Sequence, residues 1–329
     1  MVSYYEKARV GKTELSISRV GLGGAPLGNL RSMISEEQAL NTVKSALQHG
    51  FCHIDTAPLY GAGTSEERIG TVLGRYDRED YTLSTKVGRV LVPSKKPASE
   101  SSHLTGGPRF EAVFDFSENG IKKSIEGSKK RLRTDKFDLL FLHDCDDHMD
   151  EALQHSYPIL QKMKEKNEVG AIGAGLNSYV TALKLARRQP FDCFLLAGRY
   201  TLLEQGALDE FIPFCHDNSI GVIVGGVFNS GILASGPTKG AKYNYGDAPR
   251  SVLEKVTRIN EVCKLHGVEL NTVALQFVLA NPSVTSVVVG CKSPEEVESN
   301  SKALAERIPA EFWNELKSRL LVREDAPTP

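Results

Sequence analysis

The chain has 329 residues, of which 40% are apolar and 25% are charged; this composition is typical of a folded globular protein and excludes the disordered and fibrous classes. Its 40 Lys and Arg residues nearly balance its 41 Asp and Glu residues, so no excess of positive charge favours a nucleic-acid partner. No apolar run is long enough to predict a membrane span. Six cysteines scattered singly, without a secretory signal, favour reduced thiols and a cytoplasmic location.

Short β-branched segments alternate with helical patterns along the whole chain. In chain order the predicted elements are strand Arg19–Gly23, helix Ser35–His49, strand Phe51–Asp55, helix Thr64–Leu73, strand Tyr81–Lys86, helix Ile121–Leu132, strand Phe137–His143, helix Ile159–Lys166, strand Val169–Ala174, helix Tyr179–Arg188, strand Cys193–Ala197, helix Leu208–His216, strand Gly221–Gly225, helix Val252–His266, strand Val284–Val289 and helix Pro294–Leu304. About eight such units without a break in composition predict one domain, residues 1–329, folded as a (β/α)8 TIM barrel.

A doubly wound Rossmann sheet is the competing fold. It requires a G-x-G-x-x-G turn between the first strand and its helix, and here the turn reads Gly21 to Pro26, with proline where the helix should begin. No acidic residue follows at the end of the next strand with the spacing that this motif needs. The sequence therefore favours the barrel.

Helix starts and long connections complete the prediction. Ser35, Thr64 and Ser293 each begin a capping-box pattern. Two stretches exceed the usual loop length, residues 87–109 and residues 228–248, and both follow strands at the end of the barrel where TIM-barrel active sites lie. We therefore expect long functional loops at that end.

Four polar residues stand at or just after the carboxyl ends of successive predicted strands: Asp55, Tyr60, Lys86 and His143. In a barrel these ends converge on one mouth. A lysine cation beside a tyrosine favours the phenolate, and an aspartate keeps that lysine charged and in place. With a histidine that can hydrogen-bond a substrate oxygen, this set predicts proton transfer coupled to hydride transfer between a nicotinamide and a carbonyl or alcohol carbon.

At this point the residues resemble the aldo-keto reductase superfamily over most of the chain. The segment Asp55–Gly61 is similar to the family's D-T-A-x-x-Y-G motif, and the segments ending in Lys86 and His143 resemble those that carry its lysine and histidine. The resemblance implies that Asp55, Tyr60, Lys86 and His143 form a catalytic tetrad, with Tyr60 as the general acid and base.

The resemblance also implies a nicotinamide cofactor. Asn177 matches an asparagine that holds the carboxamide, whereas the family's glutamine and stacking tyrosine fall near Ala197 and at Gly225. The remaining cofactor residues implied are Phe228, Asn229, Ser230, Gly231 and Leu233 at the pyrophosphate, and Gly290, Lys292, Glu296 and Asn300 at the adenosine end.

The adenosine end bears on the choice of coenzyme. Glu296 stands where relatives that prefer NADP carry an arginine, and a carboxylate repels a 2′-phosphate but can accept a hydrogen bond from a ribose hydroxyl. Lys292 could still pair with a phosphate. The sequence therefore favours NAD, with NADP as the alternative.

Within the family, the chain resembles a group of NAD-linked dehydrogenases that includes D-threo-aldose (L-fucose) 1-dehydrogenases, L-galactose dehydrogenases and pyridoxal 4-dehydrogenases. This resemblance implies oxidation of an aldose of the L-fucose, L-galactose or D-arabinose type at C1 to the lactone. Asp144, Asp146 and Arg199 are the hypothetical substrate residues. A pyridoxal 4-dehydrogenase or a general carbonyl reductase is the alternative activity, and the oligomeric state, monomer or homo-oligomer, stays open.

Two remoter classes remain. The segment from His143 to His148 carries six potential metal ligands and suggests a metal-dependent hydrolase, although neighbouring residues of one loop cannot all turn inward and the expected H-x-H pair is absent, so we expect no metal. A non-catalytic nicotinamide-binding subunit is the other class, and the complete tetrad argues against it.

Overall fold

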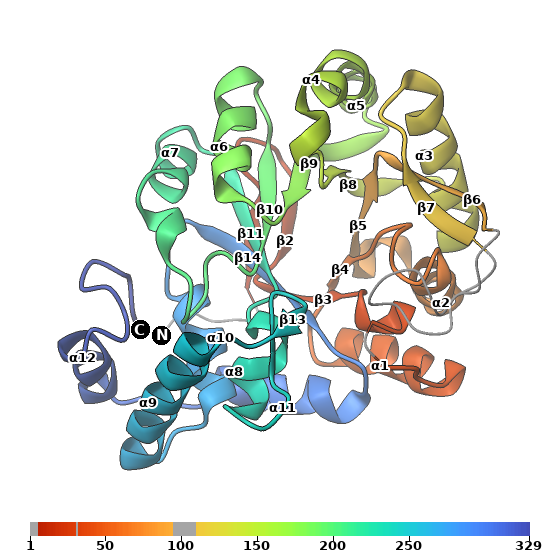
Figure 1. Cartoon of the computed structure of the whole chain (residues 1–329). Coiled ribbons are helices and arrows are strands. Elements are labelled where there is room, and N and C mark those ends of the chain that lie inside the picture. Colours follow the sequence, from red (N-terminus) through yellow and green to blue (C-terminus); the bar gives the residue numbers. More distant parts are fainter. Residues whose placement is uncertain (1–5, 31, 95–109) are drawn as a thin grey trace.

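The computed structural model describes residues 6–30, 32–94 and 110–329. Eight parallel strands close into a barrel in which each strand pairs with the next along the chain and the last pairs with the first. They are β3 (Val20–Gly23), β4 (His53–Asp55), β5 (Thr82–Val87), β8 (Phe137–His143), β9 (Val169–Leu176), β10 (Cys193–Ala197), β11 (Gly221–Gly225) and β14 (Val284–Gly290). The predicted (β/α)8 barrel is confirmed, and Figure 1 views it along its axis.

Helices surround the barrel (Figure 1). The α-helices are α1 (Glu36–Gln48), α2 (Thr64–Leu73), α3 (Glu118–Leu132), α4 (Met149–Glu151), α5 (Tyr157–Glu165), α6 (Tyr179–Arg188), α7 (Phe211–Asp217), α8 (Ile232–Ser235), α9 (Arg250–His266), α10 (Leu270–Leu279), α11 (Pro294–Ala305) and α12 (Ala310–Ser318). Short 3-10 helices are η1 (Pro26–Gly28), η2 (Arg78–Asp80), η3 (Asp146–His148), η5 (Gly206–Leu208) and η6 (Asn229–Gly231), and η4 (Ala152–Ser156) is a π-helical turn. No helix in the described ranges is long and apolar enough to cross a bilayer.

The barrel interior is a packed core whose residues alternate along the strands. On β8, Leu139 and Phe141 point into the barrel, whereas Leu140 and Leu142 pack against the surrounding helices. Successive strand side chains point to opposite faces, so His143 follows on the inward face, above Phe141. The same alternation turns Asp55 and Lys86 inward from the neighbouring strands.

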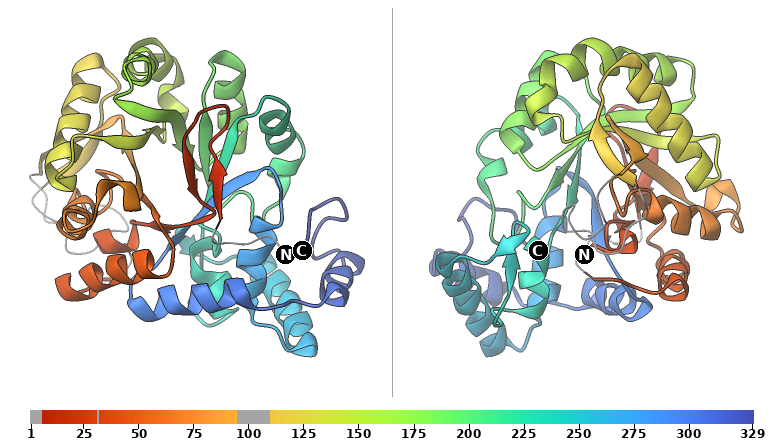
Figure 2. Two further views of the ribbon diagram at one scale, coloured as in Figure 1. Left: turned by 180° about the vertical axis from the view of Figure 1, so that it is seen from behind. Right: turned by 45° about the vertical axis from the view of Figure 1, so that its right-hand side comes forward.

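An N-terminal hairpin closes the opposite end of the barrel. Strands β1 (Lys7–Arg9) and β2 (Ser16–Ser18) pair antiparallel, and Val10 and Ile17 belong to the same buried cluster as the barrel interior. The hairpin lies in front of the barrel when the molecule is seen from behind (left view of Figure 2). The hairpin thus covers one end of the barrel interior, and the carboxyl ends of the strands form the other end, the barrel mouth.

The two predicted long loops contain secondary structure. After β5, β6 (Arg89–Pro93) pairs antiparallel with β7 (Phe110–Phe114); residues 95–109 between them lie outside the described part. The second stretch contains η6, α8 and a hairpin of β12 (Lys242–Tyr243) and β13 (Gly246–Asp247). Both stretches are long connections at the carboxyl ends of strands, as predicted, but they also contain short elements that the sequence analysis did not identify.

Other differences concern helices. The helix α10 was not predicted because its residues are almost all buried, so it has no polar face to give a helical period. The N-caps at Ser35 and Ser293 are confirmed, since each serine accepts a hydrogen bond from the backbone N–H of the third residue of its helix. The return half of each box is not formed, because the Gln38 amide donates to the Lys292 carbonyl and Glu296 accepts from the Lys292 backbone N–H. The box at Thr64 is wrong: Gly63, in a left-handed conformation, precedes the helix and makes no side-chain cap.

Candidate active site

Three of the predicted residues form a hydrogen-bonded chain at the barrel mouth. Lys86 Nζ lies 2.6 Å from Asp55 Oδ2 and 3.1 Å from the Tyr60 hydroxyl oxygen. It also donates to the Thr56 carbonyl at 2.9 Å, and the Ser84 hydroxyl donates to Asp55 Oδ1 at 2.8 Å. The lysine and the aspartate are almost fully buried, so their positions are set by packing as well as by charge.

Burial and charge act in opposite directions on these groups. Burial raises the pKa of Tyr60 to about 12, although the Lys86 cation works to lower it. Burial works to lower the pKa of Lys86, but Asp55 and Tyr60 outweigh it and raise that pKa. Tyr60 is therefore a neutral phenol beside a cation: Lys86 favours the phenolate, as predicted, but burial outweighs it.

His143 completes the predicted set. Its ring meets the Tyr60 ring edge to face, with 6.0 Å between the centroids. Burial lowers the pKa of His143 to about 4, so the imidazole is neutral near pH 7. It can then donate a hydrogen bond to a substrate oxygen without carrying a charge. The four residues that the sequence singled out thus gather at one place.

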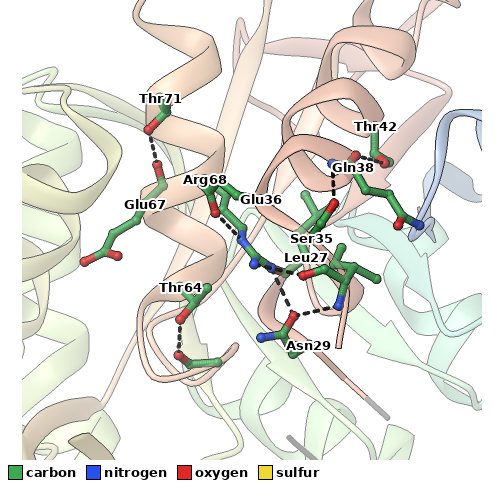
Figure 3. Close-up of polar contacts among 12 residues, drawn as sticks. Leu27, Asn29, Ser35, Glu36, Gln38, Thr42, Thr64, Glu67, Arg68 and Thr71 are labelled. Carbon is green, nitrogen blue, oxygen red and sulfur yellow. Dashed lines mark hydrogen bonds and ion pairs between the residues drawn. The ribbon is translucent and has the colours of Figure 1, made fainter. Parts of the chain in front are cut away.

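The backbone of Tyr60 is held by the loop that follows β3. A methyl group added at Gly28 would lie 2.4 Å from the Tyr60 carbonyl carbon, so only glycine permits this approach. Arg68 of α2 holds the loop: its guanidinium donates to the Leu27 carbonyl at 2.6 Å, to Asn29 Oδ1 at 3.1 Å and to Glu36 Oε2 at 2.9 Å. Figure 3 shows Arg68 at the centre of these contacts.

The residues predicted at the nicotinamide lie after β9 and at the ends of β10 and β11. The strands β10 and β11 end beside glycines, and a methyl group at Gly225, which is buried, would lie 3.4 Å from Leu195 and 3.5 Å from Val288. The amide of Asn177 stands after β9, exposed, and donates to Asp144 Oδ1 at 3.2 Å. An exposed amide side chain is a group that can hydrogen-bond a carboxamide.

The predicted pyrophosphate segment is a tight, left-handed turn. Asn229, Ser230 and Gly231 all have positive φ, and the Phe228 carbonyl accepts from the Gly231 and Leu233 backbone N–H groups. Asn229 is buried and ties the turn to neighbouring loops through Thr201 Oγ1 at 2.5 Å and the Gly198 carbonyl. Leu233 is fully buried, which gives its side chain a packing role.

The predicted adenosine end lies where β14 leads into α11. Glu296 Oε2 accepts from the Lys292 backbone N–H at 2.9 Å, and Glu296 Oε1 lies 3.7 Å from Lys292 Nζ. Asn300 is buried and donates to Cys291 Sγ at 3.3 Å, whereas Gly290 is exposed beside Pro26. The Lys292 cation is therefore partly neutralised by its own carboxylate neighbour.

The hypothetical substrate residues differ in how many contacts their side chains already make within the protein. Both carboxylate oxygens of Asp144 are engaged, with Arg89, His143 and Asn177. Arg199 donates to Asn244 Oδ1 at 2.7 Å, at the tip of the β12–β13 hairpin. Asp146 is half-buried in η3.

The six potential ligands from His143 to His148 diverge. Cys145 is fully buried, and His148 stacks on Phe114 and Phe116 with centroid distances of 4.8 and 5.4 Å. Within the described ranges, no group of three or more His, Cys, Asp or Glu side chains is arranged to hold a metal ion. The segment therefore offers no assembled metal site there.

Arg89, Ser84 and Gly28 were not singled out from the sequence. Ser84 lies two residues before Lys86, so it shares the inward face of β5, and this period was a usable signal. Nothing in the sequence signals that Gly28 touches Tyr60, or that Arg89 reaches Asp144, because both contacts join segments that only the fold brings together.

Comparison with known proteins agrees with this geometry. The Aldo/keto reductase family model matches residues 19–320. The chain is 38% identical to D-threo-aldose 1-dehydrogenase from Pseudomonas sp over 96% of both chains, and 33% identical to pyridoxal 4-dehydrogenase from Microbacterium luteolum over 96% of this chain and 98% of that one. An aldo-keto reductase from Bacillus halodurans, solved in its holo form, shares the fold with a TM-score of 0.75 at 24% identity, covering 97% of this chain and 96% of that one.

The chain therefore belongs to the aldo-keto reductase family. It is an NAD(P)-dependent oxidoreductase, and its family acts on small-molecule aldehydes or sugars. The resemblance to aldose and pyridoxal dehydrogenases expected from the sequence is confirmed.

Proposed function

We propose that the protein oxidises an aldose at C1 to the lactone with NAD as the coenzyme. The observation that carries this proposal is the buried chain Tyr60–Lys86–Asp55 at the barrel mouth, with neutral His143 beside it. The similarity to a D-threo-aldose 1-dehydrogenase over nearly the full length supports the choice of substrate class.

Each residue of the chain has a distinct role. Tyr60 exchanges the proton of the reacting hydroxyl, and Lys86 stabilises the phenolate that must form before it can accept that proton. Asp55 keeps Lys86 charged and in position. His143 donates a hydrogen bond to the substrate oxygen and so orients C1.

The reaction removes a hydride from C1 and a proton from its hydroxyl group. The bound nicotinamide supplies the acceptor for the hydride that leaves C1. The hydroxyl proton goes to Tyr60, the bond between C1 and this hydroxyl oxygen becomes the lactone carbonyl, and the bond between C1 and the ring oxygen is kept. In the reverse direction Tyr60 donates this proton.

The contacts at α11 support NAD over NADP. Glu296 is anchored by the Lys292 backbone N–H and lies beside the Lys292 ammonium. A 2′-phosphate would meet the carboxylate and a cation already paired with it, whereas a ribose hydroxyl can donate to the same carboxylate.

Arg199 and Asp146 are our candidates for contacts with sugar hydroxyls, and Asp144 acts through His143.

Oxidation of pyridoxal is the second candidate activity, supported by the 33% identical relative. Six unpaired cysteines support a cytoplasmic setting.

The test measures turnover of a panel of L- and D-aldoses and pyridoxal, with NAD and with NADP. The absorbance of the reduced coenzyme gives the rate. Tyr60→Phe should lower kcat by about 10²–10⁴ while coenzyme binding, measured by titration, stays nearly unchanged. Tyr76→Phe, on a half-buried tyrosine outside the site, is the matched control. Full activity of Tyr60→Phe would reject the proposal.

A further inference from the structure

Asp144 directly follows His143 and is held in place from several directions. Its φ is +46°, a left-handed conformation that aspartate tolerates better than most residues. Its backbone N–H donates to the Gly175 carbonyl at 2.9 Å. Arg89 Nη2 lies 3.1 Å from Oδ2, and Asn177 Nδ2 lies 3.2 Å from Oδ1.

The arginine in this network is itself fixed. Arg89 of β6 pairs with Phe114 of β7, and its guanidinium lies 3.8 Å from the centroid of the Phe114 ring. The pairing of the two strands therefore fixes the arginine. Burial works against the charge of Asp144, but His143 and Arg89 outweigh burial and lower the pKa of this carboxyl. A carboxylate is thus held beside the catalytic imidazole.

The two ring nitrogens of His143 have different surroundings. Nε2 lies 3.5 Å from Asp144 Oδ2. Nδ1 is buried, with no hydrogen-bond partner in the described part of the chain. Since Nδ1 is enclosed, Nε2 is the nitrogen left to serve a substrate oxygen.

These surroundings bear on where the imidazole carries its single proton. Nδ1 lacks a partner in either tautomer, as an N–H without an acceptor or as a lone pair without a donor, so the contact of Nε2 with Asp144 distinguishes the two. With the proton on Nδ1, the lone pair of Nε2 would point toward a carboxylate. With the proton on Nε2, the N–H dipole is attracted to that carboxylate, and at 3.5 Å no hydrogen bond to it takes up the N–H that a substrate oxygen would accept.

We propose that Asp144 is a positioning residue that holds His143 in the tautomer with its proton on Nε2. The proposal rests on the proposed function, because it makes His143 a hydrogen-bond donor to the reacting oxygen. It also removes Asp144 from the residues that read sugar hydroxyls, since both of its oxygens are engaged inside the protein.

The direct test needs no turnover. Histidine labelled with ¹⁵N distinguishes the two tautomers by NMR, and His143→Gln identifies the signals of this residue among the eight histidines. In the wild-type protein near pH 7 we expect the proton on Nε2. A wild-type signal showing the proton on Nδ1 would overturn the proposal even if the protein is an active aldose dehydrogenase.

Asp144→Asn tests the role of the charge. Asparagine suits the same left-handed backbone and still offers an oxygen to Asn177, so the variant removes the negative charge and puts an amide donor where Oδ2 faces Arg89 and Nε2. We expect a measurable population of the Nδ1–H tautomer and a fall in kcat of about tenfold with little change in KM, because only part of the molecules then present a donor.

Asp147→Asn is the matched control, since Asp147 is an exposed aspartate of the same segment. If Asp144→Asn fails to fold, the wild-type spectrum still tests the proposal, because a proton on Nδ1 of His143 would overturn it. Unchanged tautomer and unchanged kcat in a folded Asp144→Asn variant would overturn the proposal. Loss of activity in Tyr60→Phe is independent of either result.

Discussion

The buried lysine offers the sharpest test of how the site works. Lys86 is 1% exposed and contacts both Asp55 and Tyr60, so Lys86→Met removes the cation and keeps much of the side-chain volume. Two groups then lose their partner: the phenol loses its stabilising charge and the carboxylate is left buried and unpaired.

The distance gives the size of the first effect. For 3.1 Å between Nζ and the phenol oxygen, Coulomb's law at an effective dielectric constant of about 20 gives about 5 kcal/mol. Lys86→Met removes this stabilisation of the phenolate, so the pKa of Tyr60 rises further. Water that enters the vacated space reduces the effect, so we expect kcat for oxidation near pH 7 to fall by about 10²–10⁴.

The second effect is on stability and needs its own control. Breaking a buried ion pair by removing one partner costs about 3–5 kcal/mol. Asp55→Asn combined with Lys86→Met removes both charges, so its melting temperature should recover toward that of the wild type while its activity stays low.

The assay compares the kcat values of Lys86→Met, of Tyr60→Phe and of the variant that combines these two substitutions. Circular dichroism verifies that each is folded. If Lys86 acts through Tyr60, the double variant should be nearly as active as Tyr60→Phe alone, because effects within one catalytic unit do not add. Losses that multiply in the double variant would refute the reasoning and give Lys86 a separate role.

Three further outcomes are expected. Glu296→Arg should shift the ratio of kcat/KM toward NADP, because it replaces a repelling charge and frees Lys292; an unchanged ratio would contradict our reading of this end of the site. Because burial raises the pKa of Tyr60 to about 12 and oxidation needs the phenolate, kcat/KM for oxidation should rise about tenfold per unit from about pH 7 to about pH 9, and a flat profile would contradict this. Gly28→Ala should lower both activity and melting temperature, since its methyl group would press on Tyr60, whereas Gly74→Ala meets only one atom, at 3.4 Å, and should do neither.

The sequence alone determined the barrel and the position of the reacting groups. Strand alternation puts Asp55, Lys86 and His143 on inward faces, and the closure of the strands brings their carboxyl ends together, so a period of two residues was enough to predict the meeting. The sequence pattern did not predict helix α10, because its residues are almost all buried and so no polar residues recur at a helical period.

Only the tertiary structure decided how these groups are held. The approach of Gly28 to Tyr60, the capture of Arg89 by Asp144 and the enclosure of His143 Nδ1 each join segments from different parts of the barrel. Such contacts depend on strand register and loop path, which no local pattern encodes. The sign of the Tyr60 pKa shift was also decided there, because the extent of burial, and not the presence of a neighbouring lysine, dominates it.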